Sequence, residues 1–201
     1  MTPTELRVLD ATKVCCERWG IAKVTIDDIA AAANVSRATL YRMFPGGKDV
    51  LFDALRVKEL EDFFTRLTVH LDGVDELEEL LVRTVVHATI ELRADDHLAI
   101  MLASEPGDTL SNLTVQGLPR IIRMASLFLA GRVEPYMDRR SASRLVELLA
   151  RLVISYFLAP SEHVDLGDAE SARQFIGLHI LPTFPATTSA TSSATSPGEP
   201  T

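Results

Sequence analysis

The stretch TIDDIAAAANVSRATLYRMF, residues 25–44, decides the fold, because it contains two short helices joined by a turn. Thr25 is a typical N-cap residue, and Asp28 stands three positions later, as in a capping box. The turn falls at Asn34, since asparagine tolerates the left-handed backbone that a tight turn demands. Ser36 then caps the next helix, with Val35 before it to pack on a leucine four residues inside. This layout is typical of a DNA-binding helix-turn-helix.

The second of these helices has a polar face. If its apolar residues point inward, the side chains left exposed are Arg37, Thr39, Tyr41 and Arg42. Small and hydroxylated residues at its start allow close approach to base edges, and the two guanidinium groups have the reach to contact guanine or phosphate. Lys48 adds a charge at the N-terminus of the following helix, where free N–H groups suit a phosphate.

The rest of the chain also has helical periodicity, so an all-α fold is predicted. Residues 8–20 form a first helix whose predicted buried face consists of Val8, Ala11, Thr12, Cys15 and Trp19. Further helices are expected at 48–68, 75–93, 96–104, 118–136, 141–158 and 169–181, with breaks at Gly or Pro, including Pro106-Gly107. Residues 1–50 are expected to form a three-helix DNA-binding domain and 51–183 a larger helical domain. Residues 184–201 are rich in Thr, Ser and Pro and are expected to be disordered.

The distribution of charge agrees with this division. The formal net charge of the 201 residues is −8, which by itself argues against binding to nucleic acid. Residues 1–48, however, hold seven Lys and Arg against five Asp and Glu, a balance of +2, so the remainder carries −10. A cationic domain joined to an acidic one is consistent with a DNA-binding domain followed by a domain of another function.

Other classes of protein lack support in the sequence. No apolar run approaches the roughly 20 residues that cross a bilayer, and the N-terminus lacks the order of a signal peptide, so a cytoplasmic protein is expected. The adjacent Cys15 and Cys16 read as packed helix residues, with a redox role as the minor alternative. The histidines lack metal-ligand spacing, and no GxSxG, Walker or Cys/His motif is present, so we expect no metal, no cofactor and no enzyme.

Residues 25–44, followed shortly by KDVL, resemble the signature of the TetR family of transcriptional regulators, and residues 8–20 resemble that family's first helix. The resemblance covers about residues 8–55. It implies that Thr25, Ser36, Thr39, Tyr41 and Lys48 contact phosphates or bases and that Arg37 and Arg42 help to select sequence. Asn34 and Ala38 stand where the family usually has glycine, and the Pro-Gly-Gly loop is one residue longer than the common one, which affects the placement of Lys48.

By analogy with that family, the larger domain is expected to hold a small apolar molecule and to form a homodimer. The candidate ligand residues are Phe63, Phe64, His70, His87, Met101, Met124, Phe128 and Tyr136. The helix at 141–158 is apolar around most of its circumference and needs burial on more than one side. The candidate dimer residues are Leu145, Leu149, Leu152, Tyr156, Phe175 and Leu178. A central helix of a monomeric bundle is the alternative.

Together these features predict a repressor that binds a near-palindromic operator and is released by a ligand. A helical protein-interaction module is a second hypothesis, disfavoured by the retained arginines, tyrosine and lysine of the motif. An activator without ligand release also remains open, because the sequence does not encode where the operator lies relative to a promoter.

Overall fold

A computed structural model describes residues 1–104 and 106–184, and this part of the chain is entirely helical, which confirms the all-α prediction. Its helices are α1 (Pro3–Trp19), α2 (Ile26–Ala32), α3 (Arg37–Met43), α4 (Lys48–Val69), α5 (Leu77–Arg93), α6 (Asp96–Ser104), α7 (Pro106–Leu113), α8 (Leu118–Val133), α9 (Arg139–Leu158), α10 (Ala169–His179) and the 3-10 helix η1 (Leu181–Thr183). The expected disordered tail lies, apart from Phe184, outside the described residues.

Local capping explains where the first helices begin and end. Thr2 and Glu5 form a capping box before α1, and Thr25 and Asp28 form another before α2. Gly20 ends α1 with φ of 80°, a backbone region that suits glycine. Asn34 takes φ of 53° between α2 and α3, as its place in the sequence predicted.

The predicted buried face of α1 is confirmed except at its end. Val8 and Thr12 are fully buried, and Cys15 is 2% exposed. Trp19 is 41% exposed, so its prediction was wrong. It occupies the last position of the helix, and the Arg18 guanidinium lies 5.2 Å from its ring centroid.

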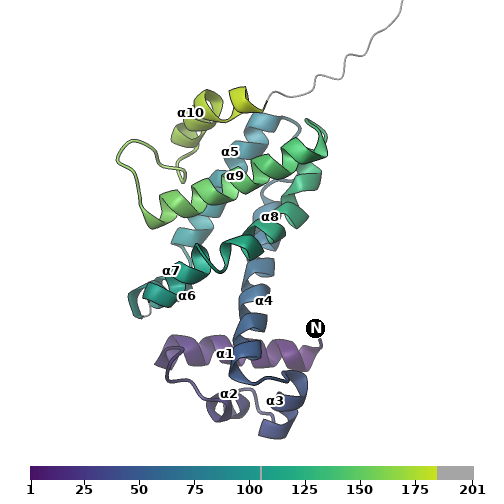
Figure 1. The fold of residues 1–201 in the computed structure, drawn as a ribbon, viewed down its shortest axis with the longest axis vertical. Helices are drawn as coiled ribbons and strands as arrows, with labels where there is room; N and C mark the ends of the chain where they lie inside the picture. Colours follow the sequence, from purple (N-terminus) through teal and green to yellow (C-terminus); the bar gives the residue numbers. More distant parts are fainter. Residues whose placement is uncertain (105, 185–201) are drawn as a thin grey trace, which may run out of the picture.

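The helices enclose two hydrophobic cores. The first core joins α1–α3 to the start of α4 and consists of Val8, Leu9, Cys15, Cys16, Val24, Ile29, Ala30, Ala33, Leu40, Phe44, Leu51, Phe52 and Leu55. The second core runs from Phe64 to Ile180 and joins the end of α4 to α5, α8, α9 and α10. Figure 1 shows α4 rising from the body formed by α1–α3 into the larger helical body. The expected boundary at residue 50 therefore falls near the start of a helix that both cores share.

One helix was missed by the sequence reasoning. Pro106-Gly107 was expected to be a break, but α7 begins at Pro106. Proline is acceptable in the first turn, because the N–H that it lacks would have no partner inside the helix. α7 packs against both α6 and α8 and reaches the side of the larger body.

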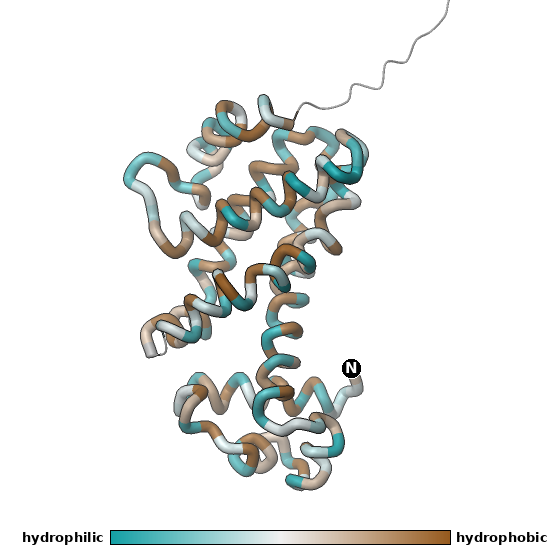
Figure 2. The backbone as a smooth tube through the Cα atoms, viewed as in Figure 1, coloured by the Kyte–Doolittle hydropathy of each residue, from teal (hydrophilic) through white to brown (hydrophobic). Residues whose placement is uncertain are grey.

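Hydrophobic and hydrophilic positions are interleaved along the helices in Figure 2, as expected of amphipathic helices that cover a core. Within residues 1–104 and 106–184, no helix is both long enough and apolar enough to span a membrane.

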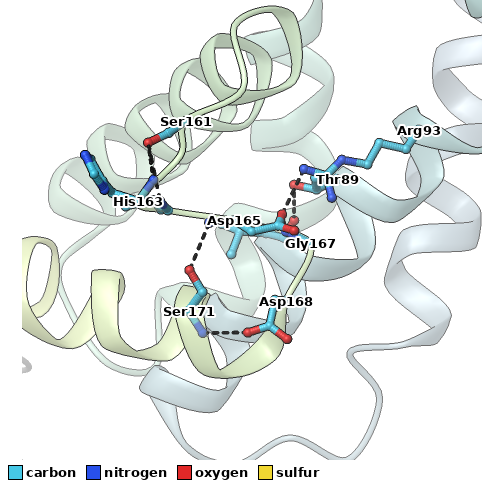
Figure 3. Close-up of polar contacts among 10 residues, drawn as sticks. Thr89, Arg93, Ser161, His163, Asp165, Gly167, Asp168 and Ser171 are labelled. Carbon is cyan, nitrogen blue, oxygen red and sulfur yellow. Dashed lines mark hydrogen bonds and ion pairs between the residues drawn. The ribbon is translucent and has the colours of Figure 1, made fainter.

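The loop between α9 and α10 is held to the end of α5 (Figure 3). Arg93 forms an ion pair of 2.8 Å with Asp165, whose carboxylate also accepts the N–H of Gly167 at 2.8 Å. The Asp165 N–H donates to the hydroxyl of Ser171 in the first turn of α10. The arginine is the main cause of a lowered pKa of Asp165, followed by the Gly167 N–H. These contacts fix the start of α10 relative to α5.

Candidate nucleic-acid interface and cavities

α3 is a seven-residue helix with one face anchored in the first core. The Ser36 hydroxyl accepts the Thr39 N–H at 3.0 Å, and Val35 packs against the first core, as predicted. Leu40 is fully buried and Phe44 is 6% exposed. The opposite face is therefore turned to solvent, where Arg37, Tyr41 and Arg42 are exposed and Thr39 is partly exposed.

Arg37 is held in place by two neighbours. Its guanidinium donates to Asp27 of α2 at 3.2 Å and lies 5.7 Å from the centroid of the Tyr41 ring. The pKa of Arg37 is raised, first by hydrogen bonding to Tyr41 and then by the charge of Asp27. The contact to Asp27 joins the two helices of the motif and orients the guanidinium before any contact with DNA.

Thr25 and Ser36 serve first as helix caps. The Thr25 hydroxyl donates to the Asp28 carboxylate at 2.6 Å and accepts the Asp28 N–H at 3.2 Å. The hydrogen bond from this hydroxyl is the main cause of a lowered pKa of Asp28. Both caps are exposed, so each hydroxyl is also within reach of a molecule lying along this surface.

The side chain of Lys48 turns toward its own domain. Its ammonium donates to the Ile21 carbonyl at 2.6 Å and lies 5.2 Å from the centroid of the Phe52 ring. An ammonium group has three donors, so this bond leaves others for a phosphate. The partner is 27 residues away in sequence, and no local signal indicates it.

Two cavities lie along α4, and residues of both the first and the second core line the outer one or pack beside it. The inner cavity has a volume of about 100 Å³ and the outer cavity about 230 Å³. Of the ligand candidates, Phe63 borders both cavities, Phe64 borders the inner one and Met101 the outer one, and their contact with a ligand stays a prediction. The outer cavity also has a charged lining, including Arg56, which the sequence did not single out.

The remaining ligand candidates line neither of these two cavities, and their contact with a ligand stays a prediction. The rings of His70 and His87 stack on each other with centroids 3.9 Å apart. Phe128 stacks on Phe64 at 5.6 Å. Three of the candidates pack against the second core: Met124, Phe128 and Tyr136. In the part of the chain that is described, no group of three or more His, Cys, Asp and Glu is placed to hold a metal ion.

The dimer candidates separate into two groups. Leu145 is fully buried and Leu149 is 4% exposed, both within the second core of their own chain, so neither offers surface to a second copy. The partly or largely exposed residues Leu152, Tyr156, Phe175 and Leu178 stay as predictions. Tyr156 and Phe175 join α9 to α10 through ring centroids 5.7 Å apart.

The fold and this motif define a class of protein: an all-helical chain with an N-terminal helix-turn-helix and a larger helical domain. Residues 8–55 match the family model described as bacterial regulatory proteins, tetR family. This match over the N-terminal part of the chain confirms the resemblance to the TetR family seen in its sequence.

Curated relatives are similar to the chain in sequence, and solved structures are similar to it in fold. The chain is 34% identical over 99 residues to an HTH-type transcriptional regulator of Mycobacterium tuberculosis (strain CDC 1551 / Oshkosh), a match that covers 49% of this chain and 50% of the relative. The chain thus spans about half the length of the curated relatives it matches. The TetR-family repressor AlkX from Dietzia sp. strain DQ12-45-1b is similar in fold, with a TM-score of 0.65 and 24% identity over 87% of this chain and 93% of that one. FadR of Bacillus subtilis has a TM-score of 0.53 and 17% identity over 85% and 96%.

Proposed function

We propose that the chain is a homodimeric transcriptional repressor that binds a near-palindromic operator through α3 and is released by a small ligand with an apolar part. The observation that carries this proposal is the exposed polar face of α3, anchored by Leu40 and capped by Ser36, within a domain of the TetR family. This proposal assigns the protein to the cytoplasm, where bacterial DNA lies.

In this reading α3 enters the major groove with its N-terminal turn foremost. Arg37 and Arg42 contact guanine edges or phosphates, because a guanidinium pairs with either in a bidentate manner. The hydroxyl groups of Thr25, Ser36, Thr39 and Tyr41 and the ammonium of Lys48 fix the register on the backbone. Two copies would place their recognition helices about 34–36 Å apart, in successive grooves.

Release by a ligand follows from the position of the cavities. They border α4, and the first turns of that helix belong to the first core with α1–α3. A ligand that prefers a conformation with another spacing of the two recognition helices weakens DNA binding, and DNA weakens ligand binding by the same factor. AlkX is implicated in biodegradation of n-alkanes, and FadR of B. subtilis was solved with stearoyl-CoA, which supports an apolar group on the ligand.

Binding-site selection on genomic DNA with purified protein tests the proposal. We expect a palindromic motif for the wild type and its loss in the double variant Arg42→Ala/Tyr41→Phe. Arg139→Ala is the matched control, because that side chain is 90% exposed at the start of α9. No enrichment over random DNA at moderate salt would overturn the proposal, and a search for a protein partner would follow. Recovery of sites that activate transcription would instead indicate an activator.

A further inference from the structure

The two cavities share part of their walls but differ in polarity. Their shared residues are Leu60, Phe63, Leu92, Leu113 and Ile121. The inner cavity is lined by apolar side chains apart from Thr84, whose hydroxyl already donates to the Leu80 carbonyl at 2.7 Å. A molecule that extends into the inner cavity therefore gains no hydrogen bond there, and that part of it must be apolar.

Three acidic residues line the outer cavity, and each has different surroundings. The Asp95 carboxylate accepts the N–H of Leu98 at 2.9 Å. Glu59 faces the Lys13 ammonium at 3.3 Å and His97 at 3.7 Å. Glu59 thus has cationic or titratable neighbours but no hydrogen bond at Oε1 from the described residues, Asp95 has a backbone N–H, and Asp108 is exposed in the first turn of α7.

The two arginines of the lining lie close to one another through a shared aspartate. Arg56 of α4 and Arg120 of α8 both approach the same carboxylate oxygen of Asp53, at 3.0 and 3.4 Å. Taken together, these two guanidinium groups and one carboxylate carry one positive charge where α4 meets α8, apart from the three acids of the lining. A guanidinium group binds a carboxylate through paired N–H donors, and a carboxylate is small enough to leave the inner cavity to an apolar group.

We propose that the effector is a small amphiphilic carboxylate, with its head group at Arg56 and Arg120 and a short apolar group in the inner cavity. The inner cavity, at about 100 Å³, is smaller than the cavity of roughly 150 Å³ that accommodates benzene in another protein. A short alkyl chain fits it, and a long acyl chain or a fused ring system does not. This inference rests on the proposed function, whose ligand it defines.

The same site reaches into the DNA-binding domain. Cys16, Ile21 and Phe52 line the outer cavity, and two of them belong to the first core while Ile21 packs against it. A ligand that fills the outer cavity lies against the domain that carries α3 as well as against α8 of the larger domain. Binding of the carboxylate and the position of α3 are then linked by direct contact.

Titration calorimetry on the full chain with hexanoate, hexan-1-ol and hexylamine tests the class of ligand. We expect hexanoate to bind at least about tenfold more tightly than the other two, the size of effect that one charge-assisted bidentate pair supplies. Arg120→Gln and Arg56→Gln should each reduce this preference. Arg123→Gln should retain it, because Arg123 lies exposed on α8 and does not line the cavity. Equal binding of the three compounds, no binding of hexanoate, or an equal loss in Arg123→Gln would overturn the proposal.

Chain length tests the size of the inner cavity. Each buried methylene normally strengthens binding by about 0.8 kcal/mol, whereas dodecanoate should bind no more tightly than hexanoate here. A steady rise in affinity to dodecanoate would overturn the size limit. Operator binding is measured separately. A protein that binds its operator but not hexanoate contradicts this inference alone, and one that binds hexanoate but no DNA contradicts the proposed function alone.

Discussion

Ser36 caps α3 on the face that we propose contacts DNA. Its hydroxyl caps α3 and also stands 2.9 Å from the Thr39 hydroxyl on the face assigned to DNA. A seven-residue helix has little stability by itself, because nucleation fixes several residues for one hydrogen bond. α3 therefore depends on its cap and on the burial of Leu40 and Phe44.

Ser36→Ala should lower the free energy of unfolding by about 1 kcal/mol, the usual cost of losing a serine N-cap. Urea denaturation measures the change. Ser143→Ala is the matched control, since its hydroxyl donates to the Arg139 carbonyl inside α9 and alanine is a better helix former there. If both variants lost the same free energy of unfolding, the Ser36 cap would add no stability beyond that of an ordinary serine in a helix.

His87 should make stability depend on pH. Burial is the main cause of its lowered pKa, followed by the charges of His70 and Arg83, while Glu91 opposes them. As pH falls below about 6.5, the unfolded chain takes up this proton before the folded chain does, so stability is lost. The free energy of unfolding should therefore decrease between neutral pH and about pH 5 less steeply in His87→Gln than in the wild type.

Urea denaturation at several pH values measures this slope. His163→Gln, a change at an exposed histidine in the loop before α10, is the control and should keep the wild-type slope. If the free energy of unfolding of His87→Gln depended on pH as steeply as that of the wild type, His87 would not be the source of this dependence.

At the scale of the helices, the turn before α3 illustrates what local sequence can determine. Asn34 at φ of 53° was predictable, because few residues adopt that conformation and the flanking capping residues frame the turn. α7 was not predictable in the same way, since Pro-Gly marks breaks more often than helix starts. The lining of the cavities was also beyond the sequence, because Arg120 reaches Asp53, the neighbour of Arg56 on α4, only through the packing of α8 on α4.

Asn34→Ala should destabilise the protein by about 1 kcal/mol, because alanine pays the steric cost of the left-handed region. Asn34→Gly should have a stability close to that of the wild type. Glycine removes the steric cost, but it also raises the conformational entropy of the unfolded chain, which offsets the gain. Thermal denaturation distinguishes the pair, and the alanine variant should melt about 2–4 °C lower. Equal melting temperatures for the two variants would show that the backbone at this turn relaxes.

At the scale of the whole molecule, the exposed residues of α9 and α10 bear on assembly. Leu178 is 64% exposed on α10, beside the partly exposed Phe175. Periodicity identified α9 as apolar on several sides but could not separate the side facing its own core from the side facing outward. That separation depends on how α5, α8 and α10 pack around it.

Leu178→Glu should shift the protein from dimer to monomer in sedimentation velocity, because a charge would lie unpaired in an apolar interface. Leu127→Glu, a change at a leucine that is 73% exposed on α8, should leave the dimer intact. Dissociation by the second variant alone would move the interface to α8. A monomeric wild type at micromolar concentration would contradict the homodimer itself.

The shared helix α4 also determines how the chain can be divided into fragments. Its 22 residues extend about 33 Å, and its buried side chains are split between the cores, with Leu51 and Phe52 in one and Phe64 and Leu67 in the other. A fragment that stops at residue 50 leaves the first core open, and one that begins at residue 51 carries those same side chains into water. Attempts to express either half will give soluble material only when the fragment keeps the part of α4 that completes its own core, so the two halves must overlap in sequence.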